Sequence, residues 1–240
     1  MRLIFVVAED PTLITPNGSF DSGEIGSASS TTERVVPLFV VSPVVDFLRR
    51  HQKVQAELVF NDRYVNLVEE GFDLVVRVEI PSDTTARGRK LVDSRRILVA
   101  SPAYLDAHGR PKVPKDLKEH ECLVHGESNP ATVWRFSRNG GAGVPVPVRG
   151  RLAANNSEAV LLMAQRGLGI ALLADWLVEA DLKRGRLVSL LDDFSAPPAP
   201  VYALVPPSRF ASPTIGALTE HLVLALLPRL VPGKADRARG

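Results

Sequence analysis

The sequence has one cysteine and no apolar run long enough to cross a membrane. A single cysteine cannot form a disulfide within the chain, so nothing indicates an oxidising compartment. No activating partner stands beside Cys122, and we interpret it as a small buried hydrophobic residue rather than a nucleophile. The apolar start, residues 3–8, ends at Glu9 and falls short of the core of about 7–15 residues that a signal peptide needs. We therefore expect a cytoplasmic protein that is not exported.

The sequence also has little net charge, with 29 basic and 27 acidic residues giving +2. A domain that binds nucleic acid normally gathers Lys and Arg on one face. Residues 1–33 hold Arg2 against five acidic residues, which leaves this segment at −4 and the remaining residues at +6. The charge gives no case for direct DNA binding, and we expect that this chain alone does not bind DNA specifically.

Patterns for metal binding, cofactor binding and catalysis are also missing. The five histidines lack metal-ligand spacing, and His120 and His125 have only Cys122 between them as a further ligand. The glycines in residues 167–169 lack the third glycine of a dinucleotide-binding loop and precede a strand pattern. No nucleophile elbow or kinase signature occurs. We predict no metal, no cofactor and no catalytic residue, so the chain is not expected to be an enzyme.

The 240 residues suffice for one large domain or two small lobes, and a hydrophobic content of 45% is ordinary for a globular protein. Residues 9–33 are rich in Ser, Thr, Gly, Pro and acid, without apolar periodicity. We therefore predict a disordered or atypical N-terminal segment over residues 1–33 and a flexible tail over residues 231–240.

From residue 34 onward, strand and helix patterns alternate. A short strand is predicted at 34–38, and Ser42 followed by proline suits the start of a helix. Strands at 56–60 and 73–78 flank a second helix capped by Asp62. This β-α-β-α-β order within about 45 residues is typical of crossover units on a mostly parallel sheet.

The rest of the chain continues in the same style. Further helix starts are predicted at Ser101–Pro102, Asn156–Ser157 and Ser212–Pro213. The remaining predicted strands are 89–92, 96–100, 122–125, 133–136, 144–148 (an edge strand), 169–173, 186–190 and 201–205. The sequence therefore predicts an α/β protein of two Rossmann-like lobes, lobe one from 34–98 plus 204–230 and lobe two from 99–203.

Ligands of α/β proteins bind at the carboxyl ends of the strands, which here points to the region between the lobes. Candidate binding residues are those where a strand gives way to a helix, because a helix N-terminus favours anions. These are Ser42, Ser101, Pro102, Asn156 and Ser157. The alternative for each is plain helix capping.

Arg77 ends a predicted strand on the same edge, where its guanidinium could bind a carboxylate through two hydrogen bonds. The alternative for Arg77 is a structural ion pair with an acid such as Glu79. Glu79 itself would repel an anionic ligand and favour an amine or a neutral one.

Several segments resemble, in order, the effector-binding (substrate-binding) domain of LysR-type transcriptional regulators. They are AELVFNDR (56–63), NLVEEGFDLVVR (66–77), ASPAYL (100–105), HECL (120–123), WRF (134–136), RGRL (149–152), NN (155–156) and GLGIA (167–171). None of these motifs is specific on its own, but their occurrence in this order over residues 34–230 is specific for the family. The sequence departs from the family at Glu79, where Gly is usual, at Ala174, where Pro is usual, and in a shorter stretch between residues 36 and 43.

The resemblance implies a fold like that of type II periplasmic binding proteins and a small-molecule effector between the lobes. A small carboxylate or a polar aromatic molecule would match the candidate donors. The resemblance also implies a homodimer, formed through helices near residues 44–50 and 215–227. Family members bind DNA through an N-terminal winged helix-turn-helix that residues 1–33 cannot hold, so we expect a truncated regulator. The alternatives are an exported solute-binding protein of a transport system and an enzyme on a two-lobe scaffold.

Overall fold

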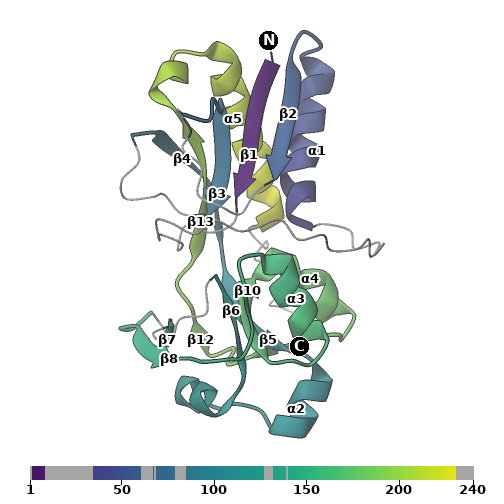
Figure 1. Cartoon of the computed structure of the whole chain (residues 1–240), viewed down its shortest axis with the longest axis vertical. Helices are drawn as coiled ribbons and strands as arrows, with labels where there is room; N and C mark the ends of the chain where they lie inside the picture. Colours follow the sequence, from purple (N-terminus) through teal and green to yellow (C-terminus); the bar gives the residue numbers. More distant parts are fainter. Residues whose placement is uncertain are drawn as a thin grey trace, which may run out of the picture.

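The computed structural model describes residues 2–8, 35–60, 67, 69–78, 85–126, 132–138 and 140–230. It has two α/β lobes, which lie one above the other in Figure 1. Each lobe is built on a five-stranded sheet, and a separate three-stranded sheet lies beside the lower one. The prediction of two lobes is confirmed.

Lobe one contains a mixed sheet in the order β2-β1-β3-β13-β4. Its strands are β1 (Arg2–Ala8), β2 (Gln55–Phe60), β3 (Leu74–Val78), β13 (Ala199–Val205) and β4 (Arg87–Ser94). Strand β1 runs parallel to both of its neighbours, whereas β13 is antiparallel to β3 and to β4. Among the described strands of this sheet, the predicted parallel pairing with crossover connections therefore holds only for β1, β2 and β3.

Strand β1 corrects the prediction that residues 1–33 form a disordered or atypical segment, which is wrong for Arg2–Ala8. An apolar run that is too short for a signal peptide has a suitable length for a strand between two others. Its register, Leu3 with Ala56 and Phe5 with Leu74, places it inside the sheet. Lobe one thus begins at residue 2; residues 9–34 and the predicted tail at 231–240 lie outside the described part.

Helices α1 (Val35–Arg50) and α5 (Pro213–Leu230) pack together on one face of this sheet (Figure 1). The predicted strand at 34–38 and the predicted helix start at Ser42 are both wrong, because α1 runs continuously through Pro43. Val40, Val44 and Phe47 repeat at helical spacing and are all buried in the core of lobe one. Burial of this stripe outweighs the backbone hydrogen bond that a proline inside a helix removes.

Lobe two contains the sheet β11-β5-β10-β6-β9. Its strands are β5 (Arg96–Ala100), β6 (Cys122–His125), β9 (Ala153–Ala154), β10 (Ile170–Ala174) and β11 (Val188–Leu190), and its helices are α2 (Pro102–His108), η1 (Pro114–Glu119), α3 (Ser157–Gln165) and α4 (Asp175–Lys183). The three-stranded sheet has the order β12 (Phe194–Ser195), β7 (Val133–Arg138) and β8 (Val144–Pro147). Strand β8 lies at an edge, as its alternating prolines predicted.

The chain crosses between the lobes twice, at Arg95 and between Ser195 and Ala199. The predicted boundaries, after residues 98 and 203, fall later than the points at which the strands change sheet. Strand β13 pairs along its whole length with β4, from Ala199 opposite Ser94 to Val205 opposite Arg87. The two crossings therefore leave lobe one from neighbouring strands. The predicted second helix, near Asp62, lies largely outside the described residues.

Candidate functional site

Strand direction determines which residues of each lobe face the other lobe. In lobe one β1, β2 and β3 run parallel and end toward lobe two (Figure 1). In lobe two β5 starts at the crossing, and β10 runs antiparallel to it, with Ala174 opposite Arg96. Strands β6 and β9 are parallel to β10, so these three strands end toward lobe one. We call these facing carboxyl ends of β1, β2, β3, β6, β9 and β10 the inter-lobe edge.

Asn156 and Ser157 lie at this inter-lobe edge, one residue beyond the end of β9, and both are partly exposed. The Asn156 Oδ1 atom accepts a hydrogen bond of 2.9 Å from the Ala159 N–H, so Asn156 is the N-cap of α3. Glu158 adds an acid to the first turn, where the helix dipole favours it. The structure therefore places these two predicted residues where the sequence expected them.

Arg77 also lies near the inter-lobe edge, opposite Ala8 of β1 and Tyr202 of β13. Its side chain is only 1% exposed, and a guanidinium at that depth is a buried positive charge. Glu79, its suggested partner, lies outside the described residues. The predicted position at the end of a strand is confirmed.

Ser101 and Pro102 lie at the opposite end of lobe two, which corrects the expectation that they converge with Asn156. They follow β5, which leads away from lobe one, and a five-residue strand separates them from the crossing by roughly 15 Å. The Ser101 Oγ atom accepts a hydrogen bond of 3.3 Å from the Tyr104 N–H and is buried beside Gly167. Capping explains both residues, because local signals mark a helix start but not the direction of the strand before it.

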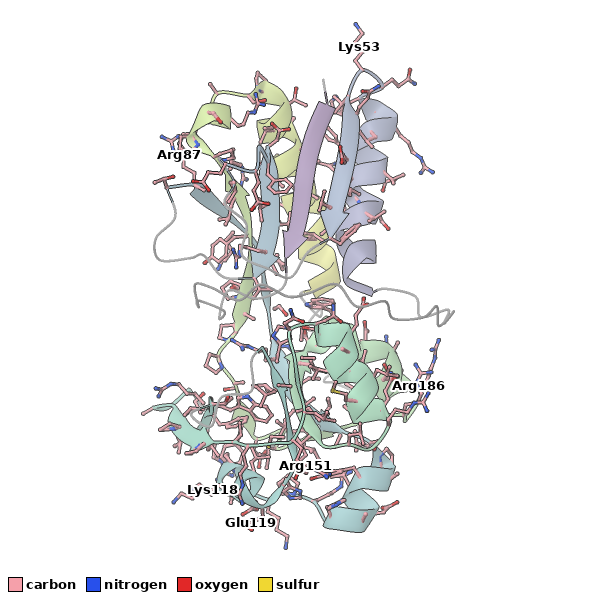
Figure 2. All side chains as sticks on the ribbon, viewed as in Figure 1. Lys53, Arg87, Lys118, Glu119, Arg151 and Arg186 are labelled. Atoms are coloured by element: carbon pink, nitrogen blue, oxygen red, sulfur yellow. The ribbon has the colours of Figure 1, made fainter. Side chains whose placement is uncertain are left out.

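Ser42 does not start a helix, because it lies inside α1. The turn after α1 leads into the amino end of β2 and is marked by Lys53 at the top of Figure 2, so α1 starts near the inter-lobe edge and runs away from it. Inside a helix, the backbone N–H groups donate hydrogen bonds to carbonyl oxygens of the preceding turn and are not available to a ligand. Ser42 is partly buried and offers no helix N-terminus to a ligand.

His125 is a residue at the inter-lobe edge that the sequence analysis missed. It ends β6 opposite Ala154, and it is partly buried. The next residue, Gly126, donates a backbone hydrogen bond of 2.8 Å to the Ala154 oxygen, which holds the end of β6 against β9. The only available clue was its position at the end of an apolar strand. Phe60, 42% exposed, occupies the corresponding end of β2.

The crossing at Arg95 is fixed to α4 of lobe two by side-chain contacts. The Trp176 indole Nε1 donates a hydrogen bond of 2.9 Å to Ser94 Oγ, and Ser94 is 1% exposed. Arg95 Nε lies 2.9 Å from Asp175 Oδ2, and the Asp175 N–H donates to the Arg95 carbonyl oxygen at 2.9 Å. These contacts fix the start of α4, at one side of the inter-lobe edge, relative to the end of β4 in lobe one.

Cys122 is completely buried, as the sequence predicted, with Sγ 3.6 Å from the Leu117 oxygen. Burial raises the pKa of its thiol to about 12, so the thiol stays protonated at neutral pH. Within the described part of the chain, no three His, Cys, Asp or Glu side chains gather as metal ligands would. None of the described helices is long and apolar enough to span a membrane.

Comparison with known proteins gives one family match, to the model described as LysR substrate binding domain, over residues 25–226. The transcriptional regulator PtxR of Pseudomonas aeruginosa is 36% identical over 178 residues, which are 73% of this chain and 56% of that protein. The transcriptional activator TtdR of Escherichia coli is 31% identical over 200 residues, or 82% of this chain and 63% of that protein.

Solved structures agree with these sequence matches. The regulatory domain of CrgA, a LysR-type transcriptional regulator from Neisseria meningitidis, superposes with a TM-score of 0.71 at 25% identity, covering 94% of this chain and 98% of that one. Full-length AphB, a virulence activator from Vibrio cholerae, shares the fold with a TM-score of 0.68 at 23% identity, covering 95% of this chain and 68% of that one. The chain spans a little over half the length of the curated relatives it matches.

Proposed function

The chain belongs to the LysR substrate-binding domain family, and we propose that it senses a small-molecule effector that binds between its two lobes. The observation that carries this proposal is the inter-lobe edge, where strands of both sheets end facing each other. In α/β proteins the carboxyl ends of strands are where ligands bind. An effector seated there touches both lobes and so favours one arrangement of the two over others.

The residues of the edge suit a small carboxylate or a polar aromatic molecule. Asn156 and Ser157 are partly exposed at the start of α3, and a helix start supplies backbone donors to an anion. Arg77, buried behind the edge, contributes positive charge rather than a surface contact. His125 adds a ring that can donate or accept a hydrogen bond. Ser42, Ser101 and Pro102 have no part in this site.

We further propose that sensing serves transcription. The relatives named above are transcription regulators, which favours a regulator over a solute-binding protein of a transport system and over an enzyme. DNA is then bound through a winged-helix domain, of which the elements in the described part of the chain form no part, and the protein works in the cytoplasm. A homodimer forms through the outer faces of α1 and α5, where Val45 is 39% and Leu224 62% exposed.

The effector site is tested by a thermal-shift screen of small carboxylates and polar aromatics. A ligand at a hundredfold excess over its dissociation constant stabilises the folded state by about 2.7 kcal/mol. We expect the shift to disappear in Asn156→Ala. The matched control is Ser101→Ala, which removes an N-cap of the same lobe at the far end of the sheet. A ligand whose shift survives Asn156→Ala and is lost in Ser101→Ala would place the site elsewhere.

A further inference from the structure

A cavity of about 380 Å³ opens on lobe two where the three-stranded sheet meets η1. Its lining comes from η1 and the residue before it, from the hairpin β7–β8 and from β12, and not from the strand ends of the inter-lobe edge. In Figure 1 this sheet lies on the side of lobe two opposite α3 and α4. The cavity is therefore separate from the effector site proposed above.

The floor and walls of the cavity are apolar. Phe136 is 3% exposed and belongs to the core of lobe two, and Phe194 packs against the same core. Val113, before η1, and Val144, in β8, also line the cavity and are 44% and 49% exposed. Burial of such apolar side chains is favourable in free energy, and exposed apolar residues around a cavity are typical of ligand-binding sites.

Among the described residues of the lining, the two polar side chains are both cations, Lys115 and Arg138. Lys115 is exposed in η1. The Arg138 guanidinium carbon lies 5.6 Å from the centre of the Phe194 ring, and an Arg138 nitrogen lies 3.6 Å from Asp193 Oδ2. Both partners of that ion pair are more than half exposed, so the pair is weak and open to exchange for another anion. None of the described lining residues is acidic.

We propose that this cavity is a second small-molecule site, for an aromatic carboxylate. The ring lies between Phe136 and Phe194 below and the two valines at the opening, and the carboxylate faces Lys115 and Arg138. A cavity of about 150 Å³ holds benzene, so 380 Å³ suits one ring or two fused rings. Aromatic walls fix the ring by stacking, and the two cations select an anion over a neutral molecule of the same shape.

The test uses the full chain and two probes, 2-naphthoate and its neutral analogue 2-naphthalenemethanol, with binding measured by isothermal titration calorimetry. Val144→Phe fills the opening, and its matched control is Val133→Phe, on the same hairpin, 44% exposed and not in the lining. Lys115→Gln and Arg138→Gln remove the cations. Their control is Lys118→Gln in η1, whose side chain points outward in Figure 2.

We expect 2-naphthoate to bind the wild type, and at least tenfold more weakly in Val144→Phe. Lys115→Gln and Arg138→Gln should each weaken it about threefold to tenfold, and the two controls should leave it unchanged. Asn156→Ala should also leave it unchanged, which separates this site from the inter-lobe edge. Absence of binding, equal binding of the neutral analogue, or binding that survives Val144→Phe in a variant with a wild-type circular dichroism spectrum overturns the proposal.

Discussion

Gly150 lies so close to β6 that a single added methyl group should destabilise lobe two. A Cβ atom built at Gly150 would lie 1.9 Å from the Cys122 carbonyl oxygen, 2.9 Å from the Cys122 carbonyl carbon and 3.1 Å from its nitrogen. All three atoms are backbone, so no side chain can rotate away. Restoring an ordinary contact of 3.4 Å requires a movement of about 1.5 Å at the start of a buried strand.

That movement acts on a segment hydrogen-bonded on both sides. The Cys122 N–H donates to the Arg149 oxygen at 2.9 Å, and the Ile170 N–H donates to the Glu121 oxygen at 2.8 Å. Overpacking costs roughly 1–3 kcal/mol and at times more. Each weakened backbone hydrogen bond adds about 1 kcal/mol. We therefore expect Gly150→Ala to lower the free energy of unfolding by roughly 3–5 kcal/mol.

Urea unfolding followed by tryptophan fluorescence measures this loss, because both tryptophans, Trp134 and Trp176, belong to lobe two. The control is Gly143→Ala in the same lobe, where the nearest described atom to the added Cβ would be the Arg135 Cβ, at 4.0 Å. The control should change the free energy of unfolding by less than about 0.5 kcal/mol. If Gly150→Ala loses less than about 1 kcal/mol, the packing argument is wrong.

Four further predictions concern the crossing, pH, the thiol and the dimer. Trp176→Phe removes the hydrogen bond to Ser94 and should cost about 1 kcal/mol in urea unfolding, and an unchanged midpoint would show that this contact does not hold the crossing. Burial, and after it the nearby charge of His108, lowers the pKa of His120 below its ordinary value of 6.5. Below about pH 6.5 the unfolded chain therefore binds more protons at this residue than the folded chain, so the free energy of unfolding should fall as the pH drops. His120→Gln should make the urea midpoint less dependent on pH between 7.5 and 5.5, and equal slopes would contradict this. The Cys122 thiol, with a pKa of about 12, should resist a thiol reagent at pH 8 until the protein unfolds, and rapid labelling of the folded protein would refute its burial. Leu224→Glu should convert a dimer to a monomer in light scattering, and a dimer that persists would exclude this face of α5.

Local signals in the sequence predicted most strands and helix caps correctly. They failed where the structure depends on which strands, distant in sequence, pair with each other. The caps at Ser101 and Asn156 were identified because an N-cap depends on four neighbouring residues. Local signals did not show that the two caps lie at opposite ends of lobe two, because β5 runs antiparallel to β10 and nothing local encodes the choice of partner strand.

The N-terminal part of lobe one shows the same limit. Strand β1 is separated by the whole of α1 from β2, its partner in the sheet, so a short apolar run alone did not indicate a central strand. At Ser42–Pro43 a pattern that usually starts a helix lies inside one, because the buried stripe on α1 decides the length of the helix. The resemblance to a family covered residues 34–230 and indicated neither feature, although it agreed with the two-lobe fold that the alternation of strand and helix patterns predicted.

The pairing of Ser94 with Ala199 makes lobe two an insertion at one point of lobe one. Strands β4 and β13 are antiparallel neighbours, and the chain leaves the first sheet after Ser94 and returns to it at Ala199. A tight two-residue turn such as Asn-Gly, placed between these residues, would turn β4 and β13 into a simple hairpin. Lobe one would then be a continuous domain with its own core, and residues 96–195 a separate module with both ends at one place. Because each lobe has its own hydrophobic core, we expect each to fold when it is expressed alone.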